Sequence, residues 1–267
     1  MREIVNEHQA KRLGKLGFCY VCGELFTDIN PSTHDHVPPR KIFRLQDRSW
    51  PLILPAHKKC NAEYSMTDEQ AKGLIALLHP ESTKRPPINT KIVGIAKRDG
   101  KPSAILLRGL KLGIVIAKIL KACHAALYGD FLPSETPNKI LMPLPEFDLK
   151  THDIVESTFL PQHEILSKLL KDNRKLKNVD RIHANNGKFR FEVVWATSDD
   201  GRVNFAAFGI DLYSWHKLGG AVLGRPQGCF GTYRIKGDTI PEGASIYAKI
   251  ELPYTYGEPL NPFEEFT

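Results

Sequence analysis

The sequence predicts an α+β protein whose strands pair mainly as antiparallel hairpins. Two apolar runs, residues 189–197 and 202–212, flank Ser-Asp-Asp-Gly, a strong signal for a turn between paired strands. Residues 88–96 and 101–107 flank Arg-Asp-Gly in the same way. Residues 110–128 instead repeat apolar side chains at helical spacing and are followed by a glycine. Hairpins beside separate helices are the pattern of the α+β class.

The chain of 267 residues is long enough for one large domain or two small ones. We expect a boundary at Lys84-Arg85-Pro86-Pro87, because two prolines and two cations after a helix end are typical of a linker. The expected domains are therefore residues 1–83 and 84–267. In the second domain, a helix is predicted from about His152 to Leu176 and a further strand from Ile246 to Leu252.

Two pairs of residues in the first domain have the spacing of zinc ligands. Cys19 and Cys22 are separated by two residues, and so are His57 and Cys60. Zn²⁺ takes four nitrogen or sulfur ligands in a tetrahedron, so a Cys-x-x-Cys knuckle needs a second pair from further along the chain. The alternative is a set of ordinary buried cysteines and a surface histidine, and the matching second pair favours zinc. We predict a structural Cys₃His zinc site.

A second group of polar residues lies between and beside these pairs. Asp35 and His36 are adjacent, and Asn61 directly follows Cys60. Carboxylate and amide oxygens suit a hard cation such as Mg²⁺. A neutral histidine beside such a cation can take a proton from an attacking water, and hydrolysis of a phosphodiester needs both groups. If a hairpin strand ends at His36 and a helix starts at Asn61, the zinc pairs staple the strand to the helix.

The order Cys-x-x-Cys, Asp-His-Val-x-Pro, Cys-Asn resembles the HNH (His-Me finger) endonucleases, which have a ββα-metal core, and in particular their zinc-stapled members. The resemblance covers about residues 15–80. It implies that the first domain is a nuclease domain in which Asp35 and Asn61 hold a catalytic Mg²⁺ or Mn²⁺ and His36 is the general base. It also implies that the structural zinc is held by Cys19, Cys22, His57 and Cys60.

The chain departs from the family pattern at two positions. His57 stands where cysteine is common, and zinc accepts either ligand. Near Leu52 the family's middle asparagine, which steadies the loop carrying the general base, has no counterpart. This second departure supports an alternative function, a zinc-stapled nucleic-acid-binding module that does not cut.

Positive charge is concentrated just after the first domain. The net charge is +7, and residues 81–125 contain ten Lys or Arg against two Asp or Glu. Clustered cations attract phosphate backbones through counterion release, although a basic solvated face is an equally simple explanation. The residues predicted to contact nucleic acid are Arg40, Lys41, Arg44, Lys97, Arg98 and Lys101.

Other polar residues are expected to have structural roles. Thr67 is predicted to cap the N-terminus of a helix, with Asp68 and Glu69 in its acidic first turn. The motif helix is expected to break just before it. His124 falls on the apolar face of its predicted helix and is expected to be a packed core histidine, and His183 is also assigned a structural role.

These inferences predict a metal-dependent DNA endonuclease, and by analogy with the family a part in phage defence or mobile elements. Double-stranded DNA is the expected partner, with RNA as the weaker alternative, and the need for a homodimer stays open. The N-terminus has no apolar segment of signal-peptide length, and the apolar run 104–127 carries four cations. We therefore expect a cytoplasmic protein without a membrane span.

Overall fold

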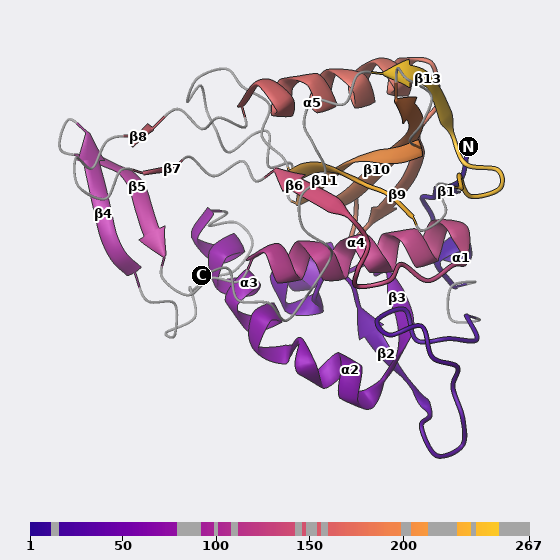
Figure 1. The fold of residues 1–267 in the computed structure, drawn as a ribbon. Helices are drawn as coiled ribbons and strands as arrows, with labels where there is room; N and C mark the ends of the chain where they lie inside the picture. Colours follow the sequence, from indigo (N-terminus) through magenta and orange to yellow (C-terminus); the bar gives the residue numbers. More distant parts are fainter. Residues whose placement is uncertain are drawn as a thin grey trace.

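The computed structural model describes residues 1–11, 16–78, 92–98, 101–107, 112–141, 146–147, 154–155, 160–198, 204–212, 229–235 and 239–250 (Figure 1). A seven-stranded mixed sheet has α4 (Leu112–Tyr128) on one face and α5 (Leu160–Lys175) on the other. The hairpin of β2 and β3, with the helices α2 and α3, lies on the far side of α4 from the sheet. Within the described part of the chain, no helix is long and apolar enough to cross a membrane.

The large sheet has the strand order β1-β9-β10-β11-β12-β6, and β13 also pairs with β10. The ten-residue β10 pairs antiparallel with β9 through its first half and parallel with β13 through its second half. The predicted hairpin is present as β10 and β11, with Phe191 opposite Ile210. The strands are β1 (Glu3–Ile4), β6 (Asn138–Leu141), β9 (Asp180–Ala184), β10 (Phe189–Ser198), β11 (Asn204–Leu212), β12 (Cys229–Tyr233) and β13 (Ile246–Ile250).

The other predicted hairpin is also present, as β4 (Ile92–Arg98) and β5 (Lys101–Leu107). The prediction of a helix from residue 152 is wrong at its start. Ile154–Val155 forms the short strand β8, which pairs with β7 (Glu146–Phe147), and α5 begins at Leu160. Pro161 explains the later start, because proline suits the first turn of a helix, where its missing N–H has no partner to lose.

One hydrophobic cluster joins the two predicted domains. It contains Tyr20 and Leu54 from the N-terminal region, Ile116 and Leu120 from α4, and Trp195 from the large sheet. The strand β1, near the start of the chain, pairs with β9 of that sheet. Residues on both sides of the predicted boundary therefore share one core, and the predicted linker itself lies outside the described residues.

The centre of this core is aromatic and confirms the prediction for His124. The His124 Nδ1 lies 3.0 Å from the hydroxyl of Tyr233, and burial lowers the pKa of this histidine to about 3. Tyr128 donates to Asp180 Oδ2 at 2.9 Å and accepts from Trp195 Nε1 at 3.0 Å. A second, smaller cluster fills the opposite face of the sheet beneath α5, from Leu166, Leu169, Leu170, Val194, Ala196, Phe205 and Ala207.

The N-terminal region forms a β-hairpin followed directly by a helix. β2 (Ser32–His36) pairs antiparallel with β3 (Ile53–His57), and Ser32 lies opposite His57. α2 (Lys58–Glu63) follows β3 without a loop, and α3 (Ser65–Leu78) follows after a break at Tyr64, close to the predicted break. The remaining described elements of this region are α1 (Glu7–Lys11) and two 3₁₀ turns, Arg40–Ile42 and Leu45–Asp47.

Candidate metal centre and adjoining pocket

The first pair of sulfur ligands lies in a tight turn before β2. Phe18 and Leu25 form an isolated antiparallel bridge on either side of it, and Gly23 N donates to the Cys19 carbonyl at 2.8 Å. Gly23 adopts a φ of +82°, which is costly for a residue with a Cβ. The turn therefore brings Cys19 and Cys22 to the same side of the backbone, as the spacing predicts.

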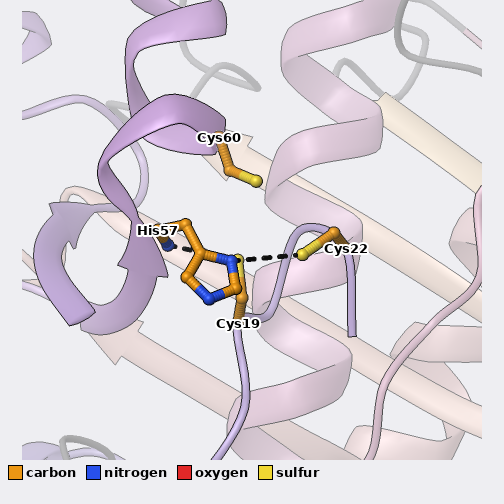
Figure 2. A group of neighbouring side chains, drawn as sticks. All are labelled: Cys19, Cys22, His57 and Cys60. Carbon is orange, nitrogen blue, oxygen red and sulfur yellow. Dashed lines mark hydrogen bonds between the residues drawn. The ribbon is translucent and has the colours of Figure 1, made fainter. Parts of the chain in front are cut away.

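The second pair joins β3 to α2. His57 is the last residue of β3 and precedes the first turn of α2, and Cys60 lies in that turn. The backbone N–H of His57 donates to Cys19 Sγ at 3.4 Å, and its Nδ1 lies 3.4 Å from Cys22 Sγ. Figure 2 shows the four side chains converging from the turn and the helix start. Their four ligand atoms, one from each residue, all lie within 4.8 Å of one another.

The donor set and its geometry fit a structural zinc. Ligands of tetrahedral zinc lie about 3.8 Å apart, so shifts of about 1 Å would close these four atoms around an ion. Burial, and then the neighbouring thiols of Cys19 and Cys22, raise the pKa of Cys60 well above its ordinary value. Cysteine binds zinc as the thiolate, and Zn²⁺ would supply the positive charge that favours ionised Cys60. The structure thus brings together all four residues predicted to hold zinc.

The residues predicted for catalysis line one pocket next to this group. The pocket has a volume of about 280 Å³ and contains all three predicted catalytic residues and two of the predicted phosphate-binding cations. Asn61 Nδ2 donates to the backbone carbonyl of His34 in a long, 3.5 Å hydrogen bond, which links α2 to β2 across the pocket. The lining residues are His34, Asp35, His36, Pro39, Arg40, Lys41, Asn61, Ser65, Asp68 and Glu69.

His36 is half-buried at the end of β2. Burial lowers the pKa of its imidazole below the ordinary value, and the nearby charge of Arg40 lowers it further. The ring is therefore mainly neutral at neutral pH, which is the form that can accept a proton. The strand alternation that gives His34 and His36 the same side turns Asp35 the other way, toward the core.

Asp35 is buried and already engaged by two side chains. The hydroxyl of Tyr20, which lies between the two knuckle cysteines, donates to Asp35 Oδ2 at 2.6 Å. The ammonium of Lys118, from α4, lies 3.0 Å from Oδ2 and 3.3 Å from Oδ1 of the same carboxylate. Lys118 also pairs with Asp68 at 2.9 Å. Asp35 therefore lines the pocket while its carboxylate is ion-paired with the buried Lys118.

The predicted N-cap at Thr67 is wrong, whereas Asp68 does lie in the first turn of α3. α3 begins at Ser65, so these residues lie inside the helix, and the Thr67 hydroxyl donates to the Tyr64 carbonyl instead of capping an N–H. Asp68 pairs with Lys118, while Glu69 pairs with Lys72 three residues later at 2.8 Å. Burial raises the pKa of Asp68, and the charge of Lys118 opposes that shift.

The predicted phosphate contacts divide into three sets. Arg40 and Lys41 are exposed at the pocket, as a phosphate contact requires. Arg44 is half-buried and its Nε donates to Asp47 Oδ2 at 2.8 Å, so its charge is already matched. For Lys97, Arg98 and Lys101 the structure describes the backbone, in β4 and β5, and not the side chains.

The basic segment 81–125 presents less charge to solvent than its composition suggests. Lys118 and Lys121 are both buried. Lys121 donates to the Val21 carbonyl at 3.0 Å and to Ser134 Oγ at 2.7 Å, and burial lowers its pKa to about 8. Two of the ten Lys and Arg side chains in the segment are therefore buried, close to the Cys19–Cys22 turn, and are not available to bind phosphate.

Searches against protein-family models, curated proteins and solved structures find no match to this chain.

Proposed function

We propose that this protein is a metal-dependent endonuclease that hydrolyses DNA phosphodiester bonds. The observation that carries the proposal is the composition of the pocket beside the Cys₃His group. It combines a neutral imidazole (His36), a carboxylate (Asp35), an amide (Asn61) and two exposed cations (Arg40 and Lys41). Phosphodiester hydrolysis needs a base for water, ligands for a cation and anchors for the phosphate, and this set supplies each.

The proposed chemistry assigns one task to each side chain. Arg40 and Lys41 hold the phosphate backbone at the pocket mouth by charge. A ring nitrogen of His36 accepts the proton of the water that attacks phosphorus, and the 3′ oxygen of the preceding nucleotide leaves. Mg²⁺ or Mn²⁺, when bound, stabilises the negative charge on that leaving oxygen.

The residues proposed to hold this cation retain the capacity to do so. A carboxylate has about four lone-pair directions. Tyr20 and Lys118 make three contacts with Asp35, which leaves one direction for a metal. The Asn61 amide uses its nitrogen toward His34, so its oxygen is the atom that suits a hard cation. One protein carboxylate and one amide, completed by water, are typical of a magnesium site.

A plasmid-cleavage assay tests the proposal. Purified protein should nick or linearise supercoiled plasmid with Mg²⁺ or Mn²⁺ and not with EDTA. His36→Ala should lower the cleavage rate by about 10²- to 10⁴-fold, the usual worth of a general base, while DNA affinity and zinc content stay unchanged. The matched control is His183→Ala, which removes a half-buried histidine of β9 outside the pocket and should cleave normally. Cleavage by His36→Ala at the unaltered rate would refute the assignment of His36 as the general base. A parallel assay with labelled RNA tests whether the substrate is DNA or RNA.

One observation favours the alternative of a module that binds nucleic acid without cutting it. The Asp35 carboxylate, expected to hold the catalytic ion, is ion-paired with Lys118. A binding module predicts salt-sensitive DNA binding with no cleavage in either metal, so the plasmid assay separates the two functions.

A further inference from the structure

The ammonium of Lys118 lies between two carboxylates that line the candidate pocket. Its side chain is 0% exposed, and its Nζ is 3.0 Å from Asp35 Oδ2 and 2.9 Å from Asp68 Oδ2. The ring of Tyr64 contributes a cation–π contact, with its centroid 5.0 Å from Nζ. The hydroxyl of Tyr20 completes the group by donating to Asp35. Four segments of the chain thus meet at one buried charge.

Stability of the core does not explain a lysine at this place. Burying an ammonium costs several kcal/mol, and ion pairs recover that cost only with good geometry. Replacement of such a buried ionic group as a whole by well-packed apolar side chains is often neutral or stabilising. Lysine is therefore better explained by what its charge does to the carboxylates than by packing.

We propose that Lys118 is a positioning residue of the nuclease site: it fixes the Asp35 carboxylate, with Asp68 as its second anchor, so that one Asp35 lone pair stays directed at the cation. This inference rests on the proposed function. It makes α4 part of the site, although α4 lies beyond the segment that resembles a nuclease. Asp35 and Asp68 are brought to one ammonium by helices and strands that the shared core holds together.

Removal of the ammonium leaves two carboxylates facing each other without the charge that holds them. Like charges this close repel, so Asp35 should leave its ligating orientation. Groups that orient a metal ligand typically contribute 10- to 100-fold to metal affinity. The positioning role therefore predicts that Lys118→Met weakens Mn²⁺ binding by about 10- to 100-fold and that Lys118→Arg restores part of it, because arginine keeps the charge.

Mn²⁺ titration of the full-length, zinc-loaded protein, followed by electron paramagnetic resonance of the free ion, measures this affinity without DNA or catalysis. The matched control is Lys121→Met, which removes another buried lysine from the same helix, one that contacts Val21 and Ser134 instead of Asp35. It should leave Mn²⁺ affinity unchanged. In cleavage assays, Lys118→Met should raise the Mg²⁺ concentration for half-maximal rate and leave the KM for DNA unchanged.

Each outcome decides the proposal. Unchanged Mn²⁺ affinity in a folded Lys118→Met protein would show a purely structural lysine, and tighter binding would show a competitor of the metal; either result overturns the positioning role. If Lys118→Met does not fold, Asp68→Asn, which keeps Lys118 paired with Asp35, should weaken Mn²⁺ binding severalfold, and an unchanged affinity overturns the proposal. Weakened Mn²⁺ binding in a protein that cleaves no substrate would uphold the positioning role and refute only the nuclease.

Discussion

Replacement of Cys60 by alanine removes one of four ligands from the group that joins the knuckle to the start of α2. In small zinc domains the ion contributes about 10–16 kcal/mol of apparent binding free energy, which is an upper bound here. Tyr20 and Leu54 are anchored in the core shared with α4, so the hairpin keeps other support. We expect Cys60→Ala to lower the free energy of unfolding by about 4 kcal/mol, near the upper end for one substitution. For a chain of this size that corresponds to a fall in Tm of roughly 8–16 °C.

Metal analysis and thermal unfolding, followed by circular dichroism, measure both parts of this prediction. The unaltered protein should contain about one zinc per chain, and Cys60→Ala much less. Cys123→Ala is the matched control, because Cys123 is a fully buried cysteine of α4 outside the group. It should keep its zinc and lose only the small packing contribution of one sulfur atom. A protein purified without zinc, with a Tm that strong chelators do not change, would refute the zinc assignment.

Two further predictions concern phosphate binding and pH. Double replacement of Arg40 and Lys41 by alanine should flatten the log–log dependence of DNA affinity on salt by up to about 1.8 units, about 0.9 for each lost phosphate contact. Arg44→Ala should change the slope less, because that side chain pairs with Asp47, and binding isotherms at several salt concentrations test both. His124 has a folded pKa of about 3, so below about pH 6.5 the unfolded chain binds a proton that the folded chain does not. As the pH is lowered from 6.5 to about 3, the free energy of unfolding should therefore decrease by about 1.4 kcal/mol per pH unit. Urea unfolding of His124→Gln should show a pH dependence without this contribution.

The zinc group could be predicted from sequence because its geometry is largely local. Each pair spans four residues, and both a knuckle turn and a first helical turn bring such residues to one side. The break before α3, the β10–β11 hairpin and the packed state of His124 were predictable for the same reason, since turn and periodicity signals act over short distances. The start of α5 was not, because the apolar pattern before Pro161 suits a strand as well as a helix.

Thr67 shows where local signals mislead. Threonine followed by two acidic residues is a common helix start. In the structure α3 begins two residues before Thr67, and the side chain of Asp68 is directed by a partner on α4. Such a partner is fixed by tertiary packing, and the same holds for the Tyr20 hydroxyl that holds Asp35.

The sequence around Lys118 indicates that lysines of this helix are buried, but only the fold identifies their partners. The helix around it carries Ile, Leu and Ala on every side, so its lysines cannot all reach solvent once the helix is covered on two sides. A buried ammonium requires polar partners, most often a carboxylate. The need for such partners follows once this apolar helix is covered, but the identity of the partner of Lys118 depends on how α4 packs between the large sheet and the hairpin. Lys118 pairs with Asp68 and with Asp35, the residue predicted to hold the catalytic ion, so the second part of the chain contributes directly to the geometry of the candidate site.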